Sequence, residues 1–412
     1  MQRRHLMQAA AASLALPLAT GTLWAAPAPG RPKFVLVFLR GAYDAANLLV
    51  PYTSDFYYEA RPHIAVPRPG SGAGGGAGGG TDAAIALNAD WALHPALRGS
   101  LLPLWQAGQL AFVPFAGTED LSRSHFETQD HIELGQGAKT GDYGVGFLNR
   151  LLGQLQEGVR PIAFSAQLPL CLRGPRRVPN MAVALAGRGG VAPGQQALLE
   201  QMWSGTGQEA SVREGFAVQA TVRHDMQDAQ ASARMVAASR GAVAPDRFVA
   251  EAARIGTLMR ESFDVGFVDV GGWDTHVAEA GENGAQGQLA RKLGSLGDGL
   301  AALRRSLGPR WRDTTVVVLS EFGRTFRENG NRGTDHGHGS VYWVLGGGVR
   351  GGRIVGEQVA LSPATLNQNR DYPVLTNDRD LLGGLFRRLW GLRDAQLQAV
   401  FPGSRPRDLG LV

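Results

Sequence analysis

The stretch FVLVFLRGAYD, residues 34–44, joins a short, wholly apolar run to a polar loop that contains glycine. The same arrangement recurs after the apolar runs 110–115, 265–270 and 315–319. Runs of this length without polar alternation are typical of strands buried on both faces, as in a parallel sheet covered by helices. Helical patterns occupy residues 245–262, 288–307 and 376–392, and further candidate strands lie at 162–165, 181–185 and 341–345. The sequence therefore predicts an α/β fold with a mostly parallel central sheet and helices on both faces.

Length and composition limit the remaining possibilities. The chain has 412 residues, and 41 Lys and Arg against 36 Asp and Glu give a net charge of +5. That excess is small and forms no basic stripe with interleaved aromatic residues, so nucleic acid is not an expected partner. The single cysteine, Cys171, excludes an internal disulfide. We expect one domain over residues 29–412, with a glycine-rich loop at 70–80 and a helical, lid-like insertion at 193–240.

The first residues predict export. Arg3 and Arg4 precede an Ala- and Leu-rich run from Leu6 to Trp24, and small residues follow where a signal peptidase could cut. This order is typical of a signal peptide of the twin-arginine or general secretory type, which we place at residues 1–28. We therefore expect a periplasmic or secreted protein. No second apolar span follows, so no transmembrane span is expected in the mature chain.

Ionisable residues gather in the loops that follow the strong strands. In an open α/β sheet these loops surround the ligand, because ligands bind at the carboxyl ends of the strands. Imidazole and carboxylate together suit zinc, manganese, magnesium or calcium, and imidazole favours the transition metals. Taken alone, each residue also has a structural interpretation, such as a helix cap or an ion pair. Together they predict a metal site, whose candidates are Asp44, His125, Asp274, His276, Glu321, Asp335, His336 and His338.

Six motifs in these loops resemble a known bacterial family, the exported proteins with domain of unknown function 1501. That family in turn looks like a distant branch of the alkaline phosphatase and sulfatase superfamily, an α/β fold in which strand-end loops hold metal ions around a nucleophile. The motifs are Phe38-Leu39-Arg40-Gly41 with Asp44, Val50-Pro51-Tyr52, Ser122-Arg123-Ser124-His125-Phe126, Trp273-Asp274-Thr275-His276, Ser320-Glu321-Phe322-Gly323-Arg324 and Thr334-Asp335-His336-Gly337.

The resemblance implies a role for each candidate. It makes Ser124 the nucleophile, and it makes Arg123 or Arg324 the group that stabilises charge on the transferred phosphoryl or sulfuryl group. One or two divalent ions would be held by Asp44, Asp274, His276, Glu321 and one of His336 and His338, with His125 and Asp335 as further candidates. Only one of the last two histidines is expected to ligate. The likeness favours His338.

These expectations describe an exported, metal-dependent hydrolase of phosphate or sulfate esters that acts on a small anionic substrate. A G-x-S-x-G nucleophile elbow is absent from the sequence, which counts against an α/β-hydrolase esterase. Phe322 stands where relatives carry a histidine ligand, and this motivates an alternative. In the alternative, the protein is an exported binding or scaffold protein that keeps the fold without catalysis. The sequence favours no oligomeric state.

Overall fold

The computed structural model describes residues 30–71, 82–137, 143–165, 167–181, 201–206, 209 and 247–412. Residues 31–412 form one compact unit. Three features expected from the sequence fall wholly or mostly outside the described residues, namely the signal peptide, the glycine-rich loop and the helical insertion at 193–240. The expected strand at 181–185 also lies outside them, except for its first residue.

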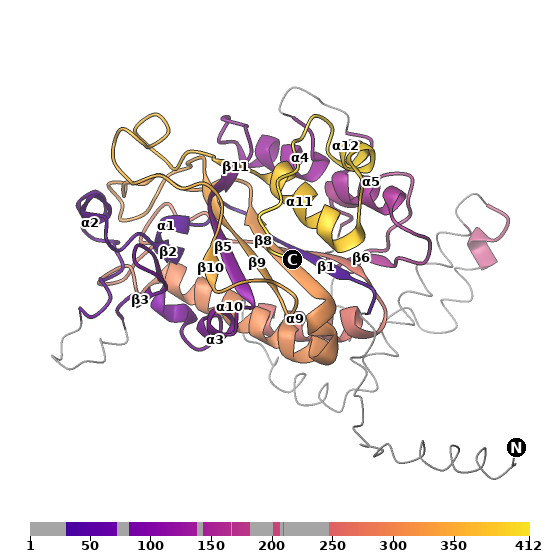
Figure 1. Ribbon diagram of the computed structural model, residues 1–412, viewed down its shortest axis with the longest axis horizontal. Helices are drawn as coiled ribbons and strands as arrows, with labels where there is room; N and C mark the ends of the chain where they lie inside the picture. The colour runs from indigo at the N-terminus through magenta and orange to yellow at the C-terminus, as the bar shows by residue number, and fades with distance from the viewer. Residues whose placement is uncertain are drawn as a thin grey trace, which may run out of the picture. The chain divides into compact units, whose positions relative to one another are not determined.

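A mainly parallel sheet forms the centre of this unit, as predicted (Figure 1). Its strands follow the order β10-β5-β9-β8-β1-β7-β6, and β11 also pairs with β5. Within the sheet, β9 alone runs against the common direction, because it is antiparallel to both of its neighbours, β5 and β8. The strands are β1 (Lys33–Leu39), β5 (Leu110–Gly117), β6 (Pro161–Ala163), β7 (Val265–Val270), β8 (Thr314–Ser320), β9 (Ser340–Gly346), β10 (Arg353–Ile354) and β11 (Thr376–Asn377).

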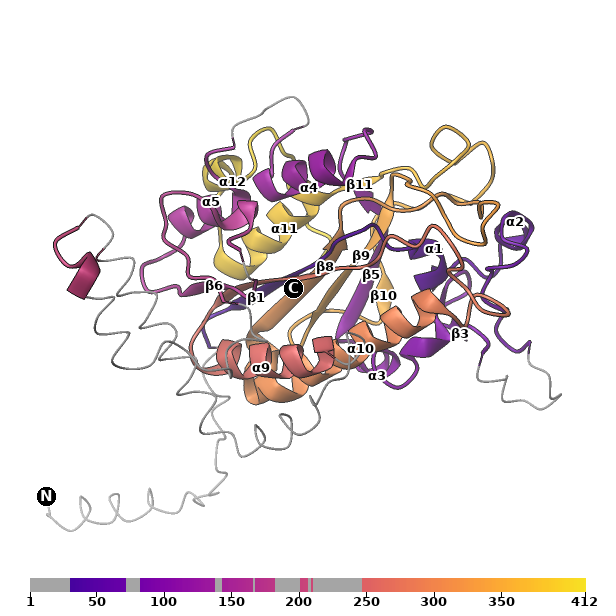
Figure 2. The same ribbon diagram turned by 180° about the vertical axis from the view of Figure 1, so that it is seen from behind.

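Helices cover both faces of the sheet (Figures 1 and 2). Successive side chains of a strand point to opposite faces, so an apolar run with no polar residue needs a core on each side. In β1, Val35 and Val37 pack in the core formed with α9 (Arg247–Glu261) and α10 (Gln288–Leu307). Phe34 and Leu36 pack in the opposite core. Its helices are α4 (His125–Leu134), α5 (Phe147–Gln154), α11 (Asp378–Trp390) and α12 (Asp394–Val400).

Shorter elements lie around the sheet. A second, antiparallel sheet has the order β2-β4-β3. No helix among the described residues is long and apolar enough to cross a lipid bilayer. The short elements are α1 (Ala45–Leu48), β2 (Leu49–Val50), α2 (Asp55–Ala60), β3 (Ile85–Ala86), β4 (Ala92–Leu93), η1 (Pro95–Leu97), α3 (Leu102–Gln106), η2 (Leu170–Leu172) and η4 (Gly308–Asp313).

The reversed direction of β9 decides which segments meet at one edge of the sheet. Strands β1, β5, β7 and β8 end at this edge, because they run the same way. Strand β9 begins there, since it is antiparallel to β5 and β8. The residues that precede β9 therefore lie beside the loops that follow the other four strands.

Candidate metal centre

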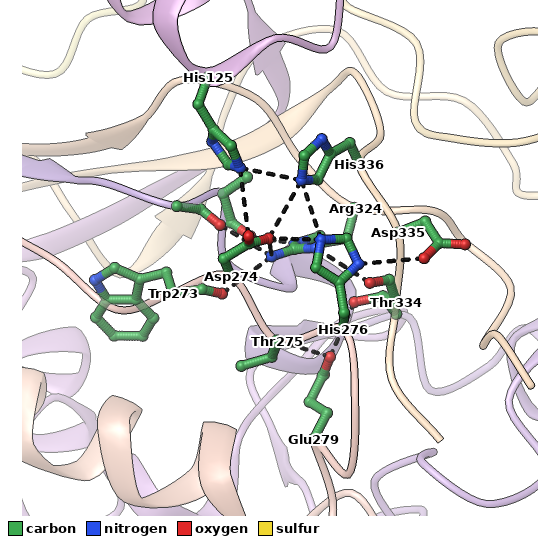
Figure 3. Close-up of polar contacts among 12 residues, drawn as sticks. His125, Trp273, Asp274, Thr275, His276, Glu279, Arg324, Thr334, Asp335 and His336 are labelled. Carbon is green, nitrogen blue, oxygen red and sulfur yellow. Dashed lines mark hydrogen bonds and ion pairs between the residues drawn. The ribbon is translucent and has the colours of Figure 1, made fainter. Parts of the chain in front are cut away.

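Four side chains from three of these segments converge at this edge (Figure 3). His125 opens α4 after β5, Asp274 and His276 follow β7, and His336 precedes β9. The Nε2 atom of His336 lies 3.0 Å from Nε2 of His125, 3.1 Å from Nε2 of His276 and 3.2 Å from Oδ1 of Asp274. Nε2 of His276 is also 2.9 Å from Asp274 Oδ1. We call these four residues the three-histidine group.

The other ring nitrogen of each histidine is held by a hydrogen-bond acceptor. Nδ1 of His125 lies 2.8 Å from Oε1 of Glu321, and Nδ1 of His276 lies 3.2 Å from Oδ1 of Asp335. Nδ1 of His336 lies 3.0 Å from the main-chain oxygen of Arg123. A carbonyl or an ionised carboxylate can only accept, so each Nδ1 carries the hydrogen. In the neutral ring Nε2 then presents a lone pair to the centre.

The lone pair of His336 Nε2 thus lies about 3 Å from those of His125 and His276 and from the Asp274 carboxylate. Nε2 of His125 lies 3.6 Å from Oδ2 of Asp274. Such an arrangement is repulsive unless positive charge lies among these atoms. Two ligands that are each about 2.0–2.2 Å from one ion are roughly 3 Å apart at ligand–metal–ligand angles near 90–110°. Histidines that bind metal through one nitrogen usually donate the other N–H to a carboxylate or carbonyl. The ligand atoms of His125, Asp274 and His336 all lie within 4.8 Å of one another, and His276 stands outside this closest set of three. The group therefore fits a divalent transition metal.

The three histidines are not equivalent towards protons. The hydrogen bond to Glu321 raises the pKa of His125 above its usual value, although burial opposes the shift. Burial, followed by the charges of His125 and Arg324, lowers the pKa of His336. Of these two histidines, His125 therefore holds a proton more strongly than His336.

Glu321 was expected to bind metal directly, but the structure places it behind His125. Its side chain has no solvent exposure, and Oε1 also accepts from the amide of Gly41 and from Nε2 of Gln129, both at 2.8 Å. Oε2 accepts from Oγ of Ser320 at 2.7 Å. Burial alone raises the pKa of Glu321, but the hydrogen bonds, led by that from His125, hold it below its usual value. Glu321 is therefore an ionised group that orients His125.

Arg324 holds Asp274 rather than a substrate. Its guanidinium has no solvent exposure, forms an ion pair with Asp274 and donates to the carbonyls of Gly41 (3.0 Å) and Thr334 (3.1 Å). Burial alone raises the pKa of Asp274, but the positive charge of Arg324 brings it below its usual value. The sequence led us to expect that Arg324 contacts the transferred group. In the structure its guanidinium is enclosed and is held by protein groups instead. The Asp274 side chain keeps 43% of its surface exposed, so solvent reaches the group.

Arg123 and Ser124 lie beside the group without entering it. The Arg123 guanidinium is bound to the buried Asp371, with Nε 3.0 Å from Oδ2, and only its carbonyl touches His336. Arg123 was also expected to stabilise charge on the transferred group. Its guanidinium is instead held by a carboxylate of the protein, like that of Arg324. Ser124 occupies the N-cap position of α4, directly before His125, and its side chain makes no cap hydrogen bond. Its side chain is partly exposed.

Asp44, expected as a ligand from the first strand, is bound to Arg61 instead. Both residues are almost completely buried, and Nη2 of Arg61 lies 3.0 Å from Oδ1 of Asp44 while Nη1 pairs with Oδ2. Asp44 also caps α1 by accepting from the amide of Ala46. Its carboxylate is thus neutralised by a cation of the protein and stays outside the three-histidine group. Sequence reasoning missed Arg61, because no motif marks it.

His338 was favoured over His336 as a ligand, but the structure brings His336 to the other histidines and to Asp274. His338 is 7% exposed, and the groups that act on it are Asp371, Arg123 and Asp120 rather than the other histidines. Burial lowers the pKa of His338. His336 and His338 do face different surroundings, and His336 is the one that faces the other histidines. Gly337 lies between them, and a Cβ atom there would lie 2.5 Å from the backbone of Arg324.

His125, only a further candidate from the sequence, stands at the centre of the group, and Asp335 supports His276 from outside it. The Phe322 ring also lies beside the imidazoles. It stacks on His125 with ring centroids 4.9 Å apart and lies 5.1 Å from the ring of His336. An apolar ring at this position excludes water from one side of the imidazoles and contributes no metal ligand.

A family model described as "Protein of unknown function (DUF1501)" matches residues 31–401. No curated protein is significantly similar to the chain in sequence. The similar solved structures include a protein in the alkaline phosphatase superfamily from Vibrio parahaemolyticus, with 11% identity, a TM-score of 0.40, and coverage of 92% of this chain and 70% of that one. Another is Ps i-CgsB in complex with k-i-k-neocarrahexaose, with 11% identity, a TM-score of 0.39, and coverage of 89% and 74%. Likenesses this weak say nothing about the chemistry of the group.

Proposed function

The chain belongs to the DUF1501 family, and we propose that it is an exported, metal-dependent hydrolase of phosphate or sulfate esters whose metal centre is the three-histidine group. One observation carries the metal centre, namely that Nε2 of His336 lies 3.0–3.2 Å from Nε2 of His125, from Nε2 of His276 and from Oδ1 of Asp274. Imidazole-rich sites favour zinc or another transition ion. The twin arginines Arg3 and Arg4 and the apolar run after them support export.

A divalent ion in such a site supplies positive charge for a phosphoryl or sulfuryl group and lowers the pKa of an oxygen nucleophile that it contacts. The residues of the chain prepare the site for that ion. Glu321, Asp335 and the Arg123 carbonyl fix the tautomers of the three imidazoles. Arg324 keeps Asp274 ionised and immobile, because it binds that carboxylate and several backbone carbonyls at once.

Ser124 is the nucleophile in this proposal. It lies at the N-terminal end of α4, where free amide groups and the helix dipole favour negative charge. Its hydroxyl would form a bond to phosphorus or sulfur as the bond to the ester oxygen breaks, and its proton would leave with that oxygen. Water would then release the acid and restore the serine.

One observation favours the second candidate, a protein that binds a ligand without catalysis. Proteins usually bind anionic esters through an arginine whose guanidinium is free to make two parallel hydrogen bonds to the anion. Arg123 is committed to Asp371, and Arg324 is committed to Asp274. Neither of these two arginines is free to pair with an anionic substrate, and the ion would supply positive charge to a bound ligand in an enzyme and in a binding protein alike.

The test combines metal analysis with a panel of aryl phosphates, phosphodiesters and sulfate esters. We expect about one equivalent of a transition metal and turnover of at least one ester class. Ser124→Ala should abolish turnover and leave the metal content unchanged, because no hydrogen bond joins the serine side chain to the group. Full metal content without turnover of any ester would support the second candidate function, a binding protein without catalysis. If the purified protein does not bind metal, both candidate functions are refuted.

A further inference from the structure

A buried carboxyl group joins the two loops that carry most of the three-histidine group. Glu279 has no solvent exposure and follows the β7 loop, three residues after His276. Its Oε2 atom accepts from Oγ1 of Thr275 and from Oγ1 of Thr334, both at 2.9 Å (Figure 3). The two threonines belong to segments that are 59 positions apart in sequence.

These threonines are the immediate neighbours of the metal-binding candidates. Thr275 stands between Asp274 and His276, and Thr334 precedes His336 by two residues. The two loops also pair through their backbones, since the Thr334 amide donates to the Thr275 carbonyl at 3.2 Å. A shift of either threonine therefore moves at least one ligand atom of the group. Ligand geometry in metal sites tolerates errors of only about 0.2 Å before affinity falls.

The surroundings of Glu279 favour a neutral acid. Burial, followed by the negative charge of Asp44, raises the pKa of Glu279 well above its usual value. Asp44 itself forms an ion pair with the buried Arg61. A neutral carboxyl group accepts both threonine hydroxyls at one oxygen and adds no net charge beneath the metal centre. A glutamine side chain offers the same acceptor and the same charge.

We propose that Glu279 is a positioning residue for the metal centre, and that its carboxyl group clamps the β7 loop to the segment before β9 so that Asp274, His276 and His336 meet at metal-binding distances. The inference rests on the proposed function only in requiring that the group bind a metal. Glu279 touches neither the group nor a substrate, and it acts through Thr275 and Thr334. A purely structural role would change the stability of the chain and leave the metal affinity of the folded protein unaltered.

The experiment titrates Zn²⁺ into the chelator-stripped protein by calorimetry and records the metal-free Tm of each variant. Loss of an outer-shell partner typically weakens metal binding by about 10- to 100-fold. We expect Glu279→Ala to raise the Kd for Zn²⁺ by about 10-fold or more. Glu279→Gln should stay within about threefold of the wild type, because its amide oxygen still accepts both hydroxyls.

If Glu279→Ala does not fold, a matched pair of substitutions at Thr334 tests the same proposal. Thr334→Val removes one clamped hydroxyl at nearly constant volume and should raise the Kd about threefold or more, whereas Thr334→Ser should restore wild-type affinity. A folded Glu279→Ala or Thr334→Val protein with unchanged Kd overturns the clamp and leaves the metal centre standing. Absence of Zn²⁺ binding by the wild type overturns both.

Discussion

Removal of His336 should weaken metal binding more than removal of His125 or His276, because its Nε2 atom contacts all three other members of the group. A ligand that binds only the folded state at 100 times its Kd stabilises that state by about 2.7 kcal/mol. The unfolding entropy is about 2.1 cal/mol/K per residue, so for the unit of residues 31–412 this corresponds to a rise in Tm of about 3 °C. We expect that rise when Zn²⁺ is added to the stripped wild type.

His336→Ala should lose this shift. Removing an outer-shell partner costs up to about 100-fold in affinity, so removing a direct ligand costs at least as much. At the same Zn²⁺ concentration the stabilisation then falls to about 0.4 kcal/mol or less, and the Tm shift to about 0.5 °C. Differential scanning calorimetry of each protein, with and without Zn²⁺, measures both values.

His338→Ala is the matched control. It removes the same side chain two residues along the same segment, from a place where the nearest charges are Asp371, Arg123 and Asp120. Its metal-free Tm should fall, because a buried side chain is lost, but the shift on adding Zn²⁺ should persist. An equal shift in His336→Ala and the wild type would refute the assignment of His336, as would its loss in His338→Ala alone.

Two further predictions concern groups that support the centre and the fold. Glu321→Gln should weaken Zn²⁺ binding by about 10- to 100-fold, because the amide removes the charge that orients His125. It should cost little stability, because the amide keeps the buried volume. Calorimetric titration measures the Zn²⁺ affinity, and an unchanged affinity would contradict the prediction. Burial lowers the pKa of His94 to about 4, so the unfolded chain binds this proton first as the pH falls, and stability should decline by about 3 kcal/mol between pH 6.5 and 4. In His94→Asn that part of the decline should vanish from urea unfolding curves recorded across this range, and an unaltered slope would show that His94 does not cause it.

The strands could be predicted because burial on both faces leaves a plain signal in the sequence. The expected runs 34–39, 110–115, 265–270 and 315–319 all lie within strands β1, β5, β7 and β8. The helix expected at 288–307 has those same limits. The segment 376–392 instead begins with the two residues of β11 before α11 starts at Asp378. Thr and Asn suit a short strand and a helix cap equally, so the sequence does not separate them.

The site was harder to predict, because its details depend on partners that are distant in the chain. The clustering of His125, Asp274, His276 and His336 follows from the order of strands and loops. The choice between His336 and His338 depends on the close packing of Gly337 against the Arg324 backbone, which leaves no pattern in the sequence. Arg61 and Glu279 carry no motif either, since each is defined by burial beside a partner that the fold supplies.

The reversed strand β9 also bears on the order of events during folding. Strands β8 and β9 form a hairpin whose contacts are close in sequence, so it forms with a small loss of chain entropy. The segment that connects the two strands carries Glu321, Arg324, Asp335 and His336. His125, however, is 211 positions from His336 and reaches it only after β5 has joined the sheet. No short segment holds the whole ligand set, so the ion cannot nucleate the fold as zinc does in a zinc finger. Under the proposed function, the ion would therefore be bound by a chain that has already folded.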